Sequence, residues 1–377
     1  MGTYLFSNYS KKPFEIMSAK GSYVVDNLGK KYLDLTSGIG VCNLGYRNPK
    51  LENALIEQSD LIWHMPNLYV SSLQEEVAQK LSYKQKYLAF FCNSGTEANE
   101  AAIKLVRKYT GKTEIITFNN SFHGRTYASM TATGQSSIHD GFGPLLEGFT
   151  YMTYNDTKYM EAITSDTAAV MLELVQGEGG VVPADYKWIQ NLSKVCKDNG
   201  VLLVIDEVQT GIGRTGSTFA FEQYDIEPDI YTVAKGLANG IPAGAMLGKK
   251  ELGSAFTPGI HGSTFGGNKL AMAVANQVLD ILENTSILDQ VKEKSNFIFE
   301  ELKNLDSPKI SQIRGLGFMI GIELKKGCLV EKILSDLEGK GILALRAGQN
   351  TLRLLPPLTV SQKELEEGLS SLKEVLE

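Results

Sequence analysis

The sequence predicts an α/β protein with a large, mostly parallel sheet covered by helices on both faces, followed by a smaller α+β domain. Apolar runs at residues 201–205 and 230–234 have the length of strands that are buried on both sides. From about residue 47 to residue 248, such runs alternate with segments of helical spacing, as in sheets whose parallel strands are joined by helices. Beyond residue 255 helices predominate, which indicates a second unit.

The first 46 residues are expected to form an N-terminal arm that is part of the smaller domain. They are too few to enclose a hydrophobic core of their own. Two runs of alternating apolar and polar residues lie on either side of Asn27 and Gly29, and this pattern predicts a strand, a tight turn and a second strand.

The large domain is expected to span residues 47–255. Its predicted helices lie at residues 49–58, 71–81, 95–110 and 186–199, and its predicted strands at 87–92, 114–118, 168–174, 201–206, 231–234 and 244–248. Ser94 and Glu97 have the spacing of a capping box at the start of the third helix. Gly111 and Gly200 follow the third and fourth helices, where glycine is favoured because the chain turns into a left-handed conformation.

The smaller C-terminal domain is expected over residues 256–377. Its predicted helices lie at residues 269–283, 288–305, 329–340 and 361–376, and its predicted strands at 310–314, 318–324, 342–345 and 352–355. Because the strands are few relative to the helices, we expect helices to cover one side of a small sheet.

The charge and the cysteine content of the chain argue against several classes of protein. The chain of 377 residues has 37 basic and 43 acidic residues, a net charge of −6 and no basic cluster, which argues against nucleic-acid binding. Its 4 cysteines have no C-x-x-C spacing, so neither a disulfide framework nor a metal site is expected, and the cytoplasm is favoured. We see no run that is long and apolar enough to cross a membrane and no signal peptide.

Two predicted strands end on residues that can carry chemistry. Asp206 ends one strand, and Lys235 directly follows the next. If the strands are neighbours, the carboxylate and the amine meet at the sheet edge where open α/β sheets bind ligands. Pyridoxal phosphate (PLP) requires such a pair, an amine that bonds to its aldehyde and an acid that keeps its ring nitrogen protonated. Taken singly, Asp206 could also be a helix cap and Lys235 an exposed strand end.

A phosphate site is predicted at Ser94, Gly95 and Thr96. These residues open a helix directly after a strand, so free backbone N–H groups and hydroxyls would face one anion, although an ordinary helix cap has the same pattern. A second stretch, GIGRTG at residues 211–216, matches the dinucleotide-binding pattern G-x-G-x-x-G. Because DEVQT precedes it and no clear helix follows it, we do not expect a dinucleotide site there.

Seven ordered motifs resemble those of the class III, fold-type I PLP-dependent aminotransferases, and most closely those of the acetylornithine aminotransferase group. The motifs are NSGTEANEAAIKLVR, FHGRT, LELVQGEGG, LLVIDEVQTGIGRTG, VAKGLANGIPAGA, HGSTFGGN and LRLLPP, and they cover nearly the whole chain. The resemblance implies the fold-type I architecture, PLP as the cofactor and amino-group transfer. Leu174 stands where the family has proline, which we expect to affect the local turn rather than the chemistry.

The resemblance implies which residues would enclose the cofactor. The phosphate would be held by Ser94, Gly95 and Thr96. The flat ring of Phe122 would stack on one face of the cofactor ring, and Val208 would pack on the other. For Phe122 and Val208, a place in the ordinary hydrophobic core is the structural alternative.

The resemblance also implies which residues would contact the reactive atoms of the cofactor, and that two subunits would share each active site. Asp206 would bind the ring nitrogen, Gln209 would lie near the phenolic oxygen, and Lys235 would attach the cofactor and then transfer the substrate's proton. Thr264 would reach the phosphate bound by a neighbouring subunit, so a homodimer with shared active sites is expected. His123, which follows Phe122, is given no role.

Two arginines are expected to bind the carboxylates of the substrates, because a planar guanidinium matches a carboxylate in a bidentate fashion. By resemblance, Arg353 would bind the α-carboxylate of glutamate and 2-oxoglutarate, and Arg125 the distal carboxylate. Glu178 would pair with Arg353 and mask it when acetylornithine is bound. Tyr9 is a further candidate for the distal carboxylate.

The expected reaction is the transfer of the δ-amino group of N2-acetyl-L-ornithine to 2-oxoglutarate, giving N-acetyl-L-glutamate 5-semialdehyde and L-glutamate in arginine biosynthesis. The small, apolar segment at residues 37–41 favours an acylated substrate. Ornithine δ-aminotransferase is the main alternative, followed by enzymes acting on succinylornithine, 4-aminobutyrate or a carrier-linked aminoadipate semialdehyde. A glutamate-1-semialdehyde aminomutase would need no external 2-oxo acid. A PLP-binding regulator is disfavoured, because both arginines would then lack a purpose.

Overall fold

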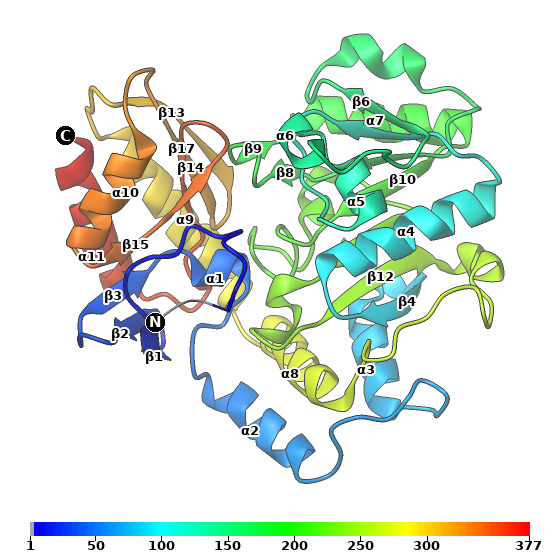
Figure 1. Ribbon diagram of the computed structural model, residues 1–377, viewed down its shortest axis with the longest axis horizontal. Coiled ribbons are helices and arrows are strands. Elements are labelled where there is room, and N and C mark those ends of the chain that lie inside the picture. Colours follow the sequence, from blue (N-terminus) through cyan, green and yellow to red (C-terminus); the bar gives the residue numbers. More distant parts are fainter. Residues whose placement is uncertain (1–3) are drawn as a thin grey trace.

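A computed structural model describes the chain from residue 4 to residue 377, apart from the side chain of Tyr159. Figure 1 shows two bodies side by side. The middle of the chain, coloured cyan to green, forms the larger body, whereas the blue N-terminal strands join the orange and red C-terminal elements in the smaller one.

The larger body is built around a seven-stranded sheet. Its strands lie in the order β4 (Tyr87–Cys92), β12 (Gly244–Lys249), β11 (Ile230–Val233), β10 (Leu202–Asp206), β7 (Ala169–Leu172), β5 (Ile115–Phe118) and β6 (Phe149–Met152). Strand β12 is antiparallel to both neighbours and the other pairs are parallel, so the mostly parallel sheet is confirmed. The sequence did not predict β6, because this edge strand has four residues of mixed burial and no clear apolar run.

Helices cover both faces of this sheet. Helix α4 (Gly95–Thr110) packs against the face to which Val204 points, and α7 (Tyr186–Asn199) packs Trp188 against the face to which Ile205 points. Successive residues of a strand point to opposite faces, and both faces are buried here. This is why β10 is apolar without alternation.

The larger body has further helices, of which α2 and α3 agree with the predicted ranges to within one residue, whereas α5 and α6 were not predicted. They are α2 (Pro49–Ser59), α3 (Ser72–Leu81), α5 (Tyr127–Ala132) and α6 (Ser136–His139), with the 3-10 turns η1 (Tyr83–Gln85), η2 (Thr157–Ala162), η3 (Ala220–Tyr224), η4 (Lys235–Ala238) and η5 (Lys250–Ala255). The side chains of Asn48 and Ser71 cap α2 and α3. Gly111 and Gly200 end α4 and α7 in the left-handed conformation, as predicted.

The smaller body contains an antiparallel sheet and the last three helices of the chain. The sheet order is β13 (Ile310–Leu316), β14 (Met319–Leu324), β17 (Thr351–Leu354) and β16 (Leu345–Ala347). Its helices are α9 (Ile287–Lys303), α10 (Val330–Gly339) and α11 (Gln362–Leu376), whereas α8 (Lys269–Asn284) packs against α2 and α3 of the larger body. The single strand predicted at 342–345 is wrong, because the chain there leaves one sheet, as β15 (Ile342–Leu343), and enters another, as β16.

The N-terminal strands pair with the C-terminal part of the chain. Strands β1 (Ile16–Lys20), β2 (Tyr23–Asp26) and β3 (Lys31–Asp34) form an antiparallel meander, which confirms the predicted hairpin, and β15 adds to β3 in parallel. This pairing supports our proposal that residues 1–46 form a small domain with residues 256–377, and that residues 47–255 form the PLP-binding domain. Residues 1–3 lie outside the described part of the chain.

Two short features complete the framework of the site. Strands β8 (Val175–Gln176) and β9 (Val182–Pro183) form a hairpin that carries Glu178 in its loop. The turn α1 (Ser37–Gly40) follows β3 and precedes the larger body along the chain. Within residues 4–377, no helix is both long and apolar enough to span a membrane.

Candidate active site

A cavity of about 460 Å³ opens at the carboxyl ends of β10 and β11. The two strands are parallel neighbours, and Asp206 lies opposite Thr232. Lys235 follows three residues later, at the start of η4. Both Asp206 and Lys235 line the cavity, so the structure brings the predicted carboxylate and amine together at one sheet edge.

Most of the predicted site residues line this cavity. They are Ser94, Gly95, Thr96, Phe122, Arg125, Glu178, Asp206, Val208, Gln209 and Lys235. Arg353 does not line it but contacts Glu178 and Gln209, which do. Val41 and Ile241 add apolar surface to the wall, and Val41 belongs to the small apolar segment noted in the sequence.

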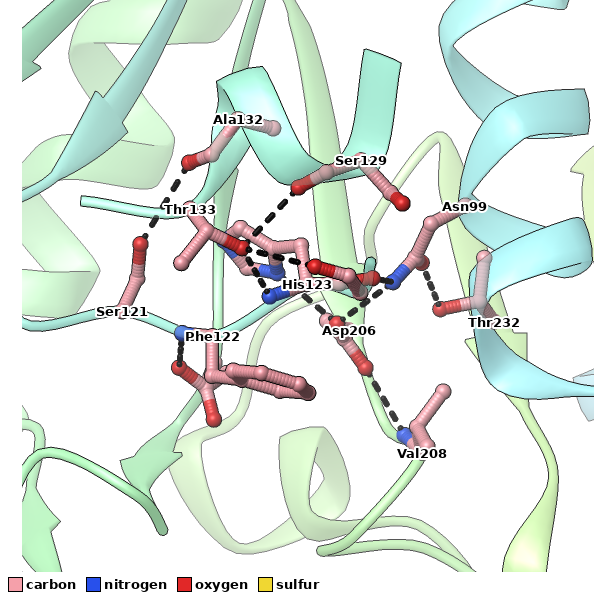
Figure 2. Close-up of polar contacts among 12 residues, drawn as sticks. Asn99, Ser121, Phe122, His123, Ser129, Ala132, Thr133, Asp206, Val208 and Thr232 are labelled. Atoms are coloured by element: carbon pink, nitrogen blue, oxygen red, sulfur yellow. Dashed lines mark hydrogen bonds and ion pairs between the residues drawn. The ribbon is translucent and has the colours of Figure 1, made fainter. Parts of the chain in front are cut away.

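Asp206 is held in one orientation by three neighbours, as Figure 2 shows. Its Oδ2 accepts a hydrogen bond from Asn99 Nδ2 at 2.8 Å and lies 2.8 Å from His123 Nδ1. Its Oδ1 accepts from the backbone N–H of Val208 at 3.0 Å. Asn99 is fixed in turn by the Thr232 hydroxyl, which donates to Asn99 Oδ1 at 2.8 Å.

His123 is the main site residue to which sequence reasoning gave no role. Burial alone would lower the pKa of His123, but the hydrogen bond to Asp206 and the charge of Asp206 outweigh burial and raise this pKa. A protonated His123 places a positive charge beside the Asp206 carboxylate and donates to it through Nδ1. The two residues are 83 positions apart in the chain, so no local pattern could reveal their contact.

Lys235 has an unusual backbone conformation. Its φ angle is 44°, in the left-handed region, which costs about 1–3 kcal/mol for a residue with a side chain and is typical of functional sites. Burial lowers the pKa of Lys235; Glu178 opposes this shift and Arg353 adds to it. A lowered pKa increases the share of neutral amine, which is the nucleophilic form.

The start of α4 forms one end of the cavity. Ser94 caps the helix, and its Oγ accepts from the Glu97 N–H at 3.3 Å. The predicted capping box is only half formed, because the Glu97 carboxylate accepts from the Asn93 N–H at 2.7 Å. The first N–H groups of an α-helix have no partner within the helix and can bind an anion.

Two glycines keep this end of the cavity compact. A Cβ atom on Gly95 would lie 2.6 Å from Cγ1 of Val208, and one on Gly124 would lie 2.2 Å from Oγ1 of Thr96. The Thr96 hydroxyl is also 2.6 Å from the Ser129 hydroxyl. The backbone and the hydroxyls can therefore lie close together only because both positions lack a side chain.

Glu178 and Arg353 form an ion pair beside the cavity, with 2.6 Å between Oε1 and Nη1. The Arg353 side chain is 3% exposed and that of Glu178 is 31% exposed. Burial alone would raise the pKa of Glu178, but the charge of Arg353 outweighs burial and lowers it. Glu178 is therefore ionised at neutral pH, and its carboxylate is paired with the Arg353 guanidinium.

Glu173 links the aromatic wall to the β8–β9 hairpin. Its carboxylate accepts from the backbone N–H groups of Phe122 at 3.0 Å and Gly177 at 3.4 Å. Burial raises the pKa of Glu173 to about 7. Arg125 is exposed, and its guanidinium carbon lies 5.6 Å from the centre of the Phe122 ring.

Besides Arg353, two further predicted residues do not line the cavity. Tyr9 is 75% exposed, and Thr264 is also exposed. The stretch at residues 211–216 folds into turns and buries Arg214. No set of three or more His, Cys, Asp or Glu side chains in the described part of the chain could hold a metal ion.

The sequence matches the family profile described as aminotransferase class-III over residues 5–376. The chain belongs to the class III aminotransferases. The acetylornithine aminotransferase of Streptococcus mutans is 54% identical over 376 residues, which are 99% of this chain and 98% of that protein. The solved structure of the N-acetylornithine aminotransferase from Stenotrophomonas maltophilia has a TM-score of 0.85 at 36% identity, covering 98% of this chain and 97% of that chain. The solved structure of the ornithine aminotransferase from Toxoplasma gondii has a TM-score of 0.93 at 28% identity, covering 99% of this chain and 92% of that chain.

The cofactor of this class III aminotransferase is PLP. PLP is present at partial occupancy at the active site of the Toxoplasma gondii structure. The cavity described above fits such a group, because it combines an amine, a fixed carboxylate and a helix start that has no room for a Cβ at Gly95. The likeness to these structures also confirms the fold-type I architecture.

Proposed function

We propose that this aminotransferase transfers the δ-amino group of N2-acetyl-L-ornithine to 2-oxoglutarate. The products are N-acetyl-L-glutamate 5-semialdehyde and L-glutamate, in a step of arginine biosynthesis. The relatives of 54% and 36% identity that carry the acetylornithine aminotransferase name support this substrate. The observation that carries the proposal is the ion pair between Glu178 and Arg353.

This ion pair would allow one active site to bind two substrates whose carboxylates lie at different distances from the reacting carbon. Acetylornithine reacts at its terminal amine, so its carboxylate must lie far from the reacting carbon, at Arg125, with Tyr9 as a further contact. A free Arg353 would attract that carboxylate to the wrong place. Glu178 prevents this by occupying Arg353, and as a partly exposed side chain it can move aside when the α-carboxylate of glutamate enters.

The polar residues around the reacting atoms have distinct proposed roles. When bound, PLP supplies an electron-withdrawing ring that stabilises negative charge at the substrate carbon. Asp206 would hold a proton on the ring nitrogen, with His123 keeping the Asp206 carboxylate in place, and Gln209 would donate to the phenolic oxygen. Lys235 would hold the cofactor between turnovers, and its neutral amine would then take the proton from the substrate carbon and return it.

The remaining residues would hold and align the cofactor. Ser94, Gly95 and Thr96 would bind its phosphate through hydroxyls and helix N–H groups. Phe122 and Val208 would clamp the ring from its two faces, which fixes the bond to be broken relative to the ring.

The proposed reaction is tested by following the cofactor spectrum of purified enzyme in single half-reactions. We expect acetylornithine to convert the PLP form to the pyridoxamine form rapidly, and ornithine and 4-aminobutyrate to do so slowly. 2-Oxoglutarate should then restore the PLP form. An enzyme that turns over without any external 2-oxo acid would instead be an aminomutase, and the proposal would be wrong.

Ornithine δ-aminotransferase is the second candidate. The likeness to the ornithine aminotransferase of Toxoplasma gondii favours it, although at 28% identity. Faster conversion by free ornithine than by acetylornithine in the same experiment would select it.

We place the enzyme in the cytoplasm. The four cysteines are free thiols, two of them buried and two partly exposed. Proteins of oxidising compartments commonly carry disulfides, so free thiols support a reducing compartment.

We propose a homodimer with active sites shared between the subunits. Large apolar side chains are exposed in the loop between α2 and α3, among them Leu68 at 89% and Trp63 at 66% exposure. This loop contacts the segment that carries Thr264, since Asn67 Nδ2 donates to the Ser263 carbonyl at 3.2 Å. A second copy of the chain that covers this apolar surface would bring Thr264 to the phosphate of its partner.

Replacing Leu68 by aspartate is expected to convert the dimer to a monomer of 41.3 kDa and to reduce activity more than tenfold. The reason is that a charge would enter an apolar interface and Thr264 would no longer reach its partner. Light scattering coupled to size-exclusion chromatography measures the mass. Leu329→Asp is the matched control, because Leu329 is 68% exposed on the smaller body, and we expect this variant to remain dimeric. A wild-type monomer with full activity would contradict the proposal.

A further inference from the structure

Arg214 carries a buried guanidinium group without an acidic partner at ion-pair distance among the described residues. Its side chain is fully buried. Nη1 donates to the carbonyl groups of Pro356 and Phe318. Nη2 donates to Ser37 Oγ at 3.0 Å and to Asn43 Oδ1 at 2.6 Å. Burying a charged group among neutral acceptors costs free energy. We therefore looked for a function that would explain a buried arginine at this position.

One branch of this network leads to Arg353. The Ser37 hydroxyl that accepts from Arg214 donates to the Leu355 carbonyl at 2.7 Å. The Leu355 N–H donates to the Leu35 carbonyl at 2.7 Å. Leu355 directly follows β17, the strand that carries Arg353, so the end of this strand is held by residues 35–37.

The other branch leads to Lys235. Asn43 accepts from Arg214 and donates through Nδ2 to the Ile212 carbonyl at 2.8 Å. A Cβ on Gly236 would lie 2.2 Å from Asn43 Nδ2, so the Asn43 amide lies directly against the backbone that follows Lys235. Arg214 thus joins the segments that carry the two ends of the proposed glutamate site.

The backbone between Ser37 and Asn43 is strained. The φ angles at residues 37–40 are 42°, 64°, 66° and 72°, which makes α1 a left-handed turn. Each residue with a side chain, such as Ile39, costs about 1–2 kcal/mol in this conformation. Such strain persists only where the surroundings enforce it, and Arg214 bonds to Ser37 at one end of the segment and to Asn43 near the other.

We propose that Arg214 is a positioning residue that sets the separation between Lys235 and Arg353 and thereby supports the half-reaction of glutamate. The inference rests on the proposed function, in which glutamate uses Arg353 and acetylornithine uses Arg125. Near-attack alignment is sensitive to displacements of about 1 Å, so loosening the strand end should impair the substrate that depends on Arg353. The substrate bound at Arg125 should be affected less.

The test compares the two half-reactions in Arg214→Met, Arg214→Lys and Ser37→Ala. We expect the ratio of kcat/KM for glutamate to kcat/KM for acetylornithine to fall at least tenfold in Arg214→Met and at least threefold in Ser37→Ala. Arg214→Lys should not restore it, because a single ammonium cannot reproduce the planar fork that bonds to separate acceptors. Ser82→Ala is the matched control, since Ser82 is also buried and donates to a carbonyl, that of Tyr87 at 2.8 Å, outside the cavity wall; its ratio should not change.

Equal losses in both half-reactions would show that Arg214 is only structural, and the inference would be overturned. If Arg214→Met does not fold, Ser37→Ala decides alone, and an unchanged ratio in that folded variant rejects the inference. Failure of the proposed function is seen separately, because wild-type enzyme would then not react with acetylornithine. In that case the ratio is measured with the ω-amino substrate that does react.

Discussion

Replacing Lys235 by alanine is expected to lower turnover to about 10⁻⁴ of the wild-type value or less. The variant loses both the nucleophilic amine and the group that transfers the substrate's proton, and the proton transfer alone is typically worth ~10²–10⁴ in rate. PLP should still bind without a covalent bond, because Asp206 and the start of α4 remain. The cofactor spectrum and the half-reaction rates measure both effects.

Lys249→Ala is the matched control for this variant. Lys249 is also a partly buried lysine of the large sheet, but it pairs with Asp229 at 2.7 Å and does not line the cavity. We expect its half-reaction rates to stay close to those of the wild type. Full activity in Lys235→Ala would reject the proposed chemistry of the site.

Replacing Glu178 by glutamine is expected to shift the preference of the enzyme from acetylornithine towards glutamate by about 10–100-fold, since a hydrogen bond to a charged group contributes ~1.5–3 kcal/mol. Glutamine has no charge to neutralise Arg353, so the carboxylate of acetylornithine competes for the guanidinium and binds in an unproductive orientation. The kcat/KM of each half-reaction measures the shift.

Arg353→Ala should have the opposite selectivity. We expect it to reduce the glutamate half-reaction by at least about 10²-fold, because the α-carboxylate loses its bidentate guanidinium partner, and each hydrogen bond to a charged group contributes ~1.5–3 kcal/mol. Glu331→Gln is the control for Glu178→Gln, since Glu331 also pairs with an arginine of the small sheet, Arg346, on an exposed surface. If Glu178→Gln changes both half-reactions equally, the masking role is wrong.

Much of the fold follows from short stretches of sequence. The boundaries of β4 and α7 agree with the predicted ranges, because the apolar run of the strand and the glycine after the helix are local signals. The neighbouring positions of Asp206 and Lys235 follow from the general behaviour of parallel sheets. Local signals fail where the chain changes sheets, as at β15 and β16, since two short strands read as one.

The sequence alone was sufficient to predict the α/β class, the helix start at Ser94 and the presence of a carboxylate and an amine at one sheet edge. The tertiary structure was needed for the contact of His123 with Asp206, the strained turn at residues 37–40 and the network around Arg214. The partners in these contacts are far apart in the chain, 177 positions in the case of Arg214 and Ser37. Helix and strand periodicity depends on neighbours within a few residues, whereas such pairs form only when the whole chain has packed.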